Sequence, residues 1–250
     1  MKSFVRAGLW AVLLGISACS SAPEAPAALR VSEDPVDPAT AGSVTGMVML
    51  TGTLPVGNPI NMASDPYCEG QAKLVNAEVV AGTGGTLQNV FIYVKDGLGN
   101  LRFPVPATPV VLDQKGCQYA PRVIGIQTGQ TLEIRNTDST LHNMHASPEH
   151  NQEFNKALGQ QGLNHIHTFS TAEVMVPFKC DVHRWMRAWV GVIDHPFHAV
   201  STADGTFSLT GLPPGTYTVE AWHESLGTQT QSVTIAEKES KDITFTFKSA

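Results

Sequence analysis

The sequence lacks the patterns that mark common enzyme active sites and nucleic-acid-binding surfaces. It shows no Ser-His-Asp order, no glycine-rich phosphate loop and no prominent pair of acids. Lys and Arg number 16 against 22 Asp and Glu, and the net charge of −6 argues against nucleic acid as a partner. The apolar stretch at residues 7–16 is too short to span a bilayer.

Cysteine is scarce, with four residues in a chain of 250. Cys19 follows a short basic segment and the apolar stretch 7–16, a pattern typical of a signal peptide. Ile16-Ser-Ala-Cys19 resembles the bacterial lipobox, which implies cleavage after residue 18 and a lipid on Cys19. An ordinary signal peptide cleaved at Ala18 is the alternative, and it would leave Cys19 as an unpaired thiol. Ser20, rather than aspartate, favours the outer membrane, so we expect a lipid-anchored protein facing the periplasm or the cell surface.

The most specific pattern is Cys180-Asp-Val-His183-Arg-Trp-Met186, preceded by His142. A thiolate, two imidazoles and a thioether form the ligand set of a blue copper centre. The short spacing brings Cys180, His183 and Met186 to one side of a tight turn between two strands. Upstream, residues 119–136 alternate apolar and polar around a Thr-Gly turn, which predicts two strands ending before His142. The sequence therefore points to copper, with zinc or another metal and a decayed metal loop as the alternatives.

On these residues, the run from about Pro109 to Asp194 resembles the cupredoxins, and among them the amicyanin and plastocyanin type. The resemblance implies one mononuclear type 1 copper site with ring nitrogens of His142 and His183, the thiolate of Cys180 and, as a long axial ligand, Met186. Asn143 would tie the two ligand-bearing loops together. The sequence departs from the family at Arg184, where proline is usual, and at residues 173–179, which lack the common Gly-x-Tyr.

Residues 202–223 show an Asp-Gly turn, a strand, a Pro-Pro-Gly turn and a second strand. They resemble the carboxypeptidase regulatory-like, transthyretin-type β-sandwich, whose further strands match residues 43–50 and 87–95. We therefore predict an all-β protein in which a Greek-key cupredoxin sandwich is inserted in, or packed on, a transthyretin-like sandwich. The predicted parts are a signal peptide (1–18), a tether poor in large apolar residues (19–42), a split sandwich (43–102 and 197–250) and the cupredoxin domain (103–196). Simple tandem order is the alternative.

Two cysteines remain if Cys19 carries lipid and Cys180 binds metal. Cys68 and Cys117 would then form a disulfide, which is permitted outside the cytoplasm. With Cys68 in the transthyretin-like sandwich and Cys117 in the cupredoxin, the bridge would staple the two domains together. Use of Cys117 as an extra copper ligand is the competing interpretation.

A His₂CysMet set fills the coordination sphere and leaves no open position for a substrate. We therefore expect a protein that is not an enzyme and that transfers one electron to or from a c-type cytochrome or another cupredoxin. A copper-handling lipoprotein without a redox partner and a structural lipoprotein with a degenerate site are the alternatives. Four further histidines lie between His142 and Cys180: His145, His150, His165 and His167. They could form a second metal site, and the alternative is that they are exposed loop residues.

In the family, the ring edge of the second histidine ligand reaches the surface. Here that residue, His183, is followed by Arg184, Trp185 and, after Met186, Arg187. Cations around one loop of an acidic chain predict a basic docking rim and a partner with an acidic face. The alternative is that the two arginines only solvate an exposed turn.

Overall fold

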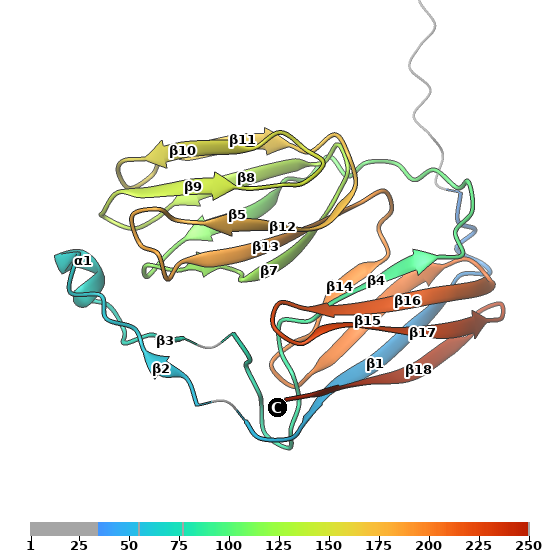
Figure 1. Ribbon diagram of the computed structural model, residues 1–250. Helices are drawn as coiled ribbons and strands as arrows, with labels where there is room; N and C mark the ends of the chain where they lie inside the picture. The colour runs from blue at the N-terminus through green and yellow to red at the C-terminus, as the bar shows by residue number, and fades with distance from the viewer. Residues whose placement is uncertain (1–34, 55, 77, 250) are drawn as a thin grey trace, which may run out of the picture. The chain divides into compact units, whose positions relative to one another are not determined.

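The computed structural model describes residues 35–54, 56–76 and 78–249, and this part of the chain is all-β (Figure 1). The predicted signal peptide, the lipidation of Cys19 and most of the predicted tether lie outside the described residues. Within the described ranges, no helix is both long and apolar enough to pass through a membrane.

The first sandwich has one sheet of three strands and one of four, with strand orders β15-β1-β18 and β14-β4-β16-β17. Inward-facing residues alternate with exposed ones along these strands, and Val44, Val48 and Phe245 are fully or almost fully buried in the shared core. The strands are β1 (Gly42–Thr51), β4 (Phe91–Asp96), β14 (His198–Val200), β15 (Thr206–Leu212), β16 (Gly215–His223), β17 (Gly227–Ile235) and β18 (Ser240–Lys248).

Both sheets of this sandwich combine strands from the two flanks of the chain. β1 pairs antiparallel with β15 and parallel with β18, while β4 lies between β14 and β16. The strand predicted at 87–95 begins later, at Phe91. Asn89 has φ of 63°, a left-handed conformation that interrupts an extended strand.

A fragment of residues 197–250 is expected not to fold alone. It would hold β14 to β18 but lack β1 and β4, which are interior strands of the two sheets. Chemical denaturation followed by circular dichroism should therefore give no cooperative transition for the fragment and a cooperative one for residues 35–250. A cooperatively unfolding fragment would show that the two early strands are dispensable.

The second sandwich has sheets ordered β10-β9-β12-β13-β7 and β11-β8-β5-β6. Its separate core includes Leu112, Ile126, Ile134, Val176 and Phe178. Gly129 has φ of 83° in the predicted Thr-Gly turn between β7 and β8. The strands are β5 (Val110–Gln114), β6 (Tyr119–Ala120), β7 (Val123–Gln127), β8 (Thr131–Asn136), β9 (His142–Ala146), β10 (Phe154–Leu158), β11 (Asn164–Thr168), β12 (Glu173–Lys179) and β13 (Arg187–Ile193).

Phe91 of β4 packs closely against residues of the second sandwich. A Cβ added at Gly191 would lie 2.5 Å from the Phe91 ring, and one at Gly125 would lie 2.2 Å from the ring of His198. These two glycines therefore permit an approach that any side chain would block.

Phe103, predicted as the first residue of the cupredoxin, packs in the core of the first sandwich, so the change from one core to the other occurs after it.

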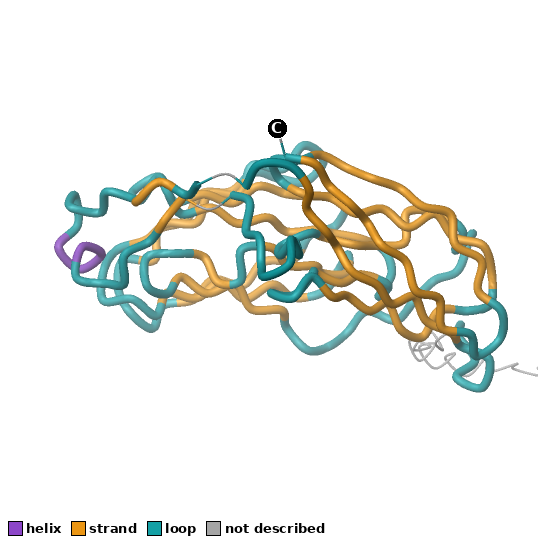
Figure 2. The backbone as a smooth tube through the Cα atoms, turned by 90° about the horizontal axis from the view of Figure 1, so that it is seen from below, coloured by secondary structure: helices purple, strands orange, loops and turns teal. Residues whose placement is uncertain are grey.

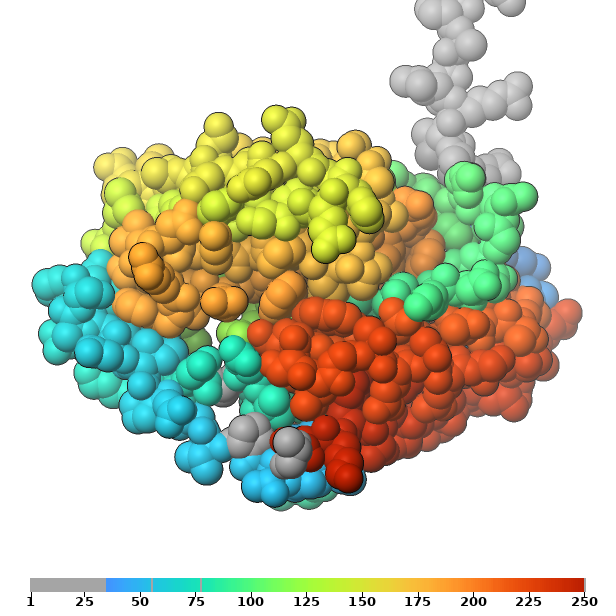
Figure 3. Space-filling model, in the orientation of Figure 1, coloured from blue at the N-terminus to red at the C-terminus, as the bar shows by residue number. Residues whose placement is uncertain are grey.

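Between β1 and β4 the chain leaves the first sandwich and forms a segment of residues 58–76, here called the α1 segment. It contains β2 (Asn58–Pro59), the short helix α1 (Pro66–Glu69) and β3 (Val75–Asn76), with α1 drawn purple in Figure 2. Cys68 of α1 is bonded to Cys117, so the predicted disulfide is present. Its placement was wrong in one respect, because Cys68 packs with Met62, Cys117 and Trp185 rather than in the core of the first sandwich. The bridge thus fastens the α1 segment, cyan to teal in Figure 3, to the second sandwich.

Candidate metal centre

The four predicted ligands lie at two adjoining positions of the second sandwich. His142 is the first residue of β9, while Cys180, His183 and Met186 occupy the turn between β12 and β13. Met186 donates its backbone N–H to the carbonyl of His183 at 2.9 Å, and Cys180 donates to the carbonyl of Met186 at 3.2 Å. These bonds close the turn tightly. All four side chains are buried, with no more than 1% of any residue exposed.

The donor atoms of His142, Cys180 and His183 converge on one another. The two Nδ1 atoms are 2.9 Å apart, and Cys180 Sγ lies 3.9 Å from His183 Nδ1. Each of the three residues offers one donor atom, and these atoms lie within 4.8 Å of one another. Met186 packs in the same core cluster as Cys180. Two imidazoles and a thiol, directed inward with water excluded, are suited to a soft or borderline transition metal.

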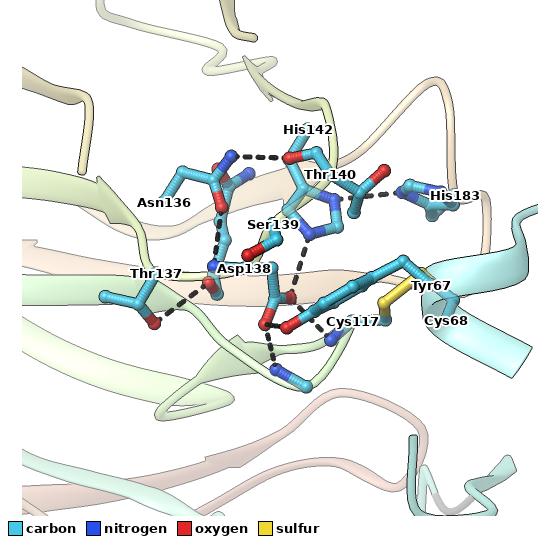
Figure 4. A network of polar contacts seen from close by, with 12 residues as sticks. Tyr67, Cys68, Cys117, Asn136, Thr137, Asp138, Ser139, Thr140, His142 and His183 are labelled. Carbon is cyan, nitrogen blue, oxygen red and sulfur yellow. Dashed lines mark hydrogen bonds and ion pairs between the residues drawn. A yellow bond between two sulfur atoms is a disulfide. The ribbon is translucent and has the colours of Figure 1, made fainter. Parts of the chain in front are cut away.

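Two carboxylates hold the opposite nitrogens of the imidazoles. His142 Nε2 lies 2.9 Å from Asp138 Oδ2 (Figure 4), and His183 Nε2 lies 3.0 Å from Asp65 Oδ2. A carboxylate at Nε2 keeps the proton on that nitrogen and leaves Nδ1 free to bind a metal. Sequence reasoning missed both acids. Asp138 lies four residues before His142, which is a weak local signal, whereas no local signal connects Asp65 with His183.

Charge within this cluster favours a Cys180 thiolate beside a cationic His142 ring, and a metal would displace the Nδ1 proton of that ring as it binds. Burial raises the pKa of the Cys180 thiol, but hydrogen bonds from His142 and His183 outweigh burial and lower it to about 6. Burial lowers the pKa of His142, yet its contacts with Asp138 and Cys180 prevail and raise it to about 9. A thiolate is the form in which cysteine binds a metal, so the protein's own groups prepare Cys180 for ligation.

Asn143 links the two ligand-bearing elements. Its Oδ1 accepts the backbone N–H of Asp181 at 2.7 Å, and its Nδ2 donates to Asn155 Oδ1 at 2.7 Å. Asn143 thus joins β9 to the turn that carries Cys180. This is the position that the resemblance assigned to it.

The expected docking residues are only partly at the surface. Arg184 and Arg187 are exposed, whereas Trp185 is half-buried, donates its indole N–H to the Cys117 carbonyl at 3.0 Å and lies 5.1 Å from the His183 ring. The ring edge of His183, expected to reach the surface, is covered, because the residue is 1% exposed and its Nε2 meets Asp65. The expectation of an exposed ring edge was therefore wrong for His183, because Asp65 of the α1 segment covers that edge.

The remaining histidines lie apart from the buried cluster. His145 contacts Asp181 at 2.9 Å and Glu153 at 2.7 Å on the surface, and the rings of His165 and His167 are 6.4 Å apart on β11. In the described part of the chain, none of these three joins a group of three converging donors. Two further groups of donors contain Cys68 or Cys117, whose sulfurs are joined in the disulfide and offer no thiolate.

Comparison with known proteins finds one family match and a set of similar solved structures. A sequence model of the carboxypeptidase regulatory-like domain matches residues 189–248. No curated protein sequence matches the chain. A variant of amicyanin with Cu(I) is 22% identical over 35% of this chain and 85% of its own, with a TM-score of 0.31, and a purple cupredoxin from Nitrosopumilus maritimus is 23% identical over 35% and 99%, with a TM-score of 0.29.

A copper-containing nitrite reductase from Thermus scotoductus SA-01 is 20% identical over 40% of this chain, with a TM-score of 0.33. The chain spans only 26% of that reductase. By their descriptions, these three neighbours are cupredoxins or contain copper. The C-terminal part of this chain, residues 189–248, matches a carboxypeptidase regulatory-like domain.

Proposed function

We propose that this protein carries single electrons by means of one mononuclear type 1 copper ion. The observation that carries the proposal is the convergence of His142 Nδ1, His183 Nδ1 and Cys180 Sγ in a buried cluster. Cys180 is the free cysteine of the described chain, which suits it to thiolate ligation. Met186, in the same turn and core cluster, would provide the weak fourth contact.

When bound, copper would supply a Cu(II)/Cu(I) couple that takes up and releases one electron. The residues of this chain would hold the ligands in nearly the same positions in both states, since the turn is closed by backbone hydrogen bonds and tied to β9 by Asn143. The packed core around Cys180 excludes water. A closed, buried donor set favours electron transfer over catalysis on a bound molecule, because no position is left for a substrate.

A copper-handling role without a redox partner is the second candidate. The thiol pKa of about 6 supports it, because a preformed thiolate also favours tight copper binding. Electron exchange with a small cytochrome or another cupredoxin would separate the two.

We also propose that the chain is anchored outside the cytoplasm by lipid on Cys19, and that exposed Arg184 and Arg187 face an acidic redox partner.

Titration of the purified chain from Ser21 with Cu(II) tests the proposal. We expect one copper ion per chain, an intense absorption band in the red from Cu(II)–thiolate charge transfer, and a type 1 paramagnetic resonance spectrum, because the donor set is a trigonal His₂Cys arrangement. Titration with Zn(II) is the control, since zinc has no such band. A colourless one-to-one copper complex would contradict the proposal.

A further inference from the structure

The α1 segment places a carboxylate against a proposed copper ligand from a distant part of the chain. Asp65 Oδ2 lies 3.0 Å from His183 Nε2, although the two residues are 118 positions apart. His183 is 1% exposed, and the Asp65 side chain that meets it is 18% exposed. The ring edge therefore faces a fixed negative group instead of water.

Asp65 is held in place by contacts that do not involve His183. Its Oδ1 accepts the backbone N–H groups of Tyr67 at 2.8 Å and Cys68 at 3.3 Å, which makes it the N-cap of α1. Its Oδ2 accepts the hydroxyl of Thr140 at 2.6 Å. The carboxylate of Asp65 is thus oriented by α1 and by the loop before β9. Its position does not depend on the contact with His183.

The short helix is itself fastened to the second sandwich at two points. The disulfide joins Cys68 to Cys117, and Tyr67 donates its hydroxyl to Asp138 Oδ1 at 3.1 Å, in the network drawn in Figure 4. Asp138 also accepts the N–H groups of Gly116 at 2.7 Å and Cys117 at 2.8 Å. One connected network therefore supports the outer nitrogen of both imidazoles.

From this arrangement we infer that Asp65 is a positioning residue for the copper ligand His183, a role that rests on the proposed function. The carboxylate keeps the ring proton on Nε2, directs Nδ1 toward Cys180 and His142, and places a negative charge behind the ring. A negative charge there would strengthen electron donation from the ring to the metal and would stabilise Cu(II) more than Cu(I). Asp65 thereby lowers the reduction potential and closes the His183 edge to solvent and partners.

The first test measures the reduction potential of copper-loaded Asp65→Asn and Asp65→Ala in the chain from Ser21. Asparagine caps helices about as well as aspartate, so Asp65→Asn removes the charge while keeping α1. We expect it to shift the preference toward Cu(I) about tenfold, which corresponds to a rise of about 59 mV. Asp65→Ala should shift it at least as far.

Glu69→Gln is the matched control, because Glu69 is an exposed acid of the same short helix and, in the described part of the chain, forms no ion pair with an imidazole. It removes the same charge and should leave the potential unchanged. An Asp65→Asn potential equal to that of the wild-type protein, or a shift of equal size in Glu69→Gln, would overturn the inference.

The second test needs no copper and so separates this inference from the proposed function. In the metal-free chain, nuclear magnetic resonance should show a slowly exchanging ring proton on His183 Nε2, present in the wild type and in Glu69→Gln and lost in Asp65→Ala. Loss of that proton would support the positioning role even if copper binding failed. A proton that persists in a folded Asp65→Ala protein would overturn it.

Discussion

Replacing Cys180 with serine is expected to remove the red absorption band and to weaken Cu(II) binding by more than the roughly 10–100-fold that loss of an outer-shell partner costs. The hydroxyl of serine stays protonated at neutral pH and is a poor ligand for copper, whereas the pKa of the Cys180 thiol is about 6. His142 and His183 would remain and would still hold copper weakly. Absorption spectra and competition with a chelator of known affinity measure the two effects.

Met186→Leu is the matched control for this substitution. Met186 lies in the same turn, is equally buried and would provide only a weak axial contact. It should keep the colour while raising the reduction potential. A Cys180→Ser protein that binds copper as tightly as the wild type would refute the assignment of the thiolate ligand.

Removal of the disulfide by Cys68→Ala together with Cys117→Ala should lower the free energy of unfolding by about 2–4 kcal/mol. The bridge closes a loop between residues separated by 49 positions, so its loss frees much of the unfolded chain. The same change should loosen the α1 segment, which contains Asp65 and Tyr67, and should therefore expose His183. Urea denaturation measures the first effect.

The copper spectrum and potential of the double variant measure the effect on the site. Glu69→Ala provides the control in the same helix, because a substitution at this exposed position should change the free energy of unfolding by no more than about 0.5 kcal/mol. A double variant as stable as the wild-type protein would show that other contacts alone hold the α1 segment in place.

The sequence predicted the parts of the site that follow from local spacing. Cys180, His183 and Met186 lie in one short turn, and the alternation around Gly129 gave the two strands before His142. The pairing of early with late strands was predicted because residues 43–50 and 87–95 resemble strands of the same small sandwich as residues 202–223. These features depend on short-range pattern, which a sequence displays directly.

The partners of the imidazoles could not be predicted in the same way. Asp65 precedes Pro66 and caps a four-residue helix, a pattern that many surface turns share. Its contact with His183 exists only because the α1 segment crosses to the second sandwich and is fastened there by Cys117. The expectation of an exposed His183 edge failed for this reason, since a resemblance limited to residues 109–194 contains no α1 segment.

The parallel pairing of β1 with β18 has a consequence for the order in which the molecule assembles. Ser43 and Ser240 lie opposite each other although they are separated by 197 positions. The sheet that contains β1 is therefore incomplete until nearly the whole chain is present. The strands β5 to β13 and their core are all present long before β18 is made. As the chain is exported, the sandwich that carries Cys180 is therefore expected to form first, and the disulfide is expected to join Cys68 to Cys117 outside the cytoplasm while β1 and β18 are still unpaired.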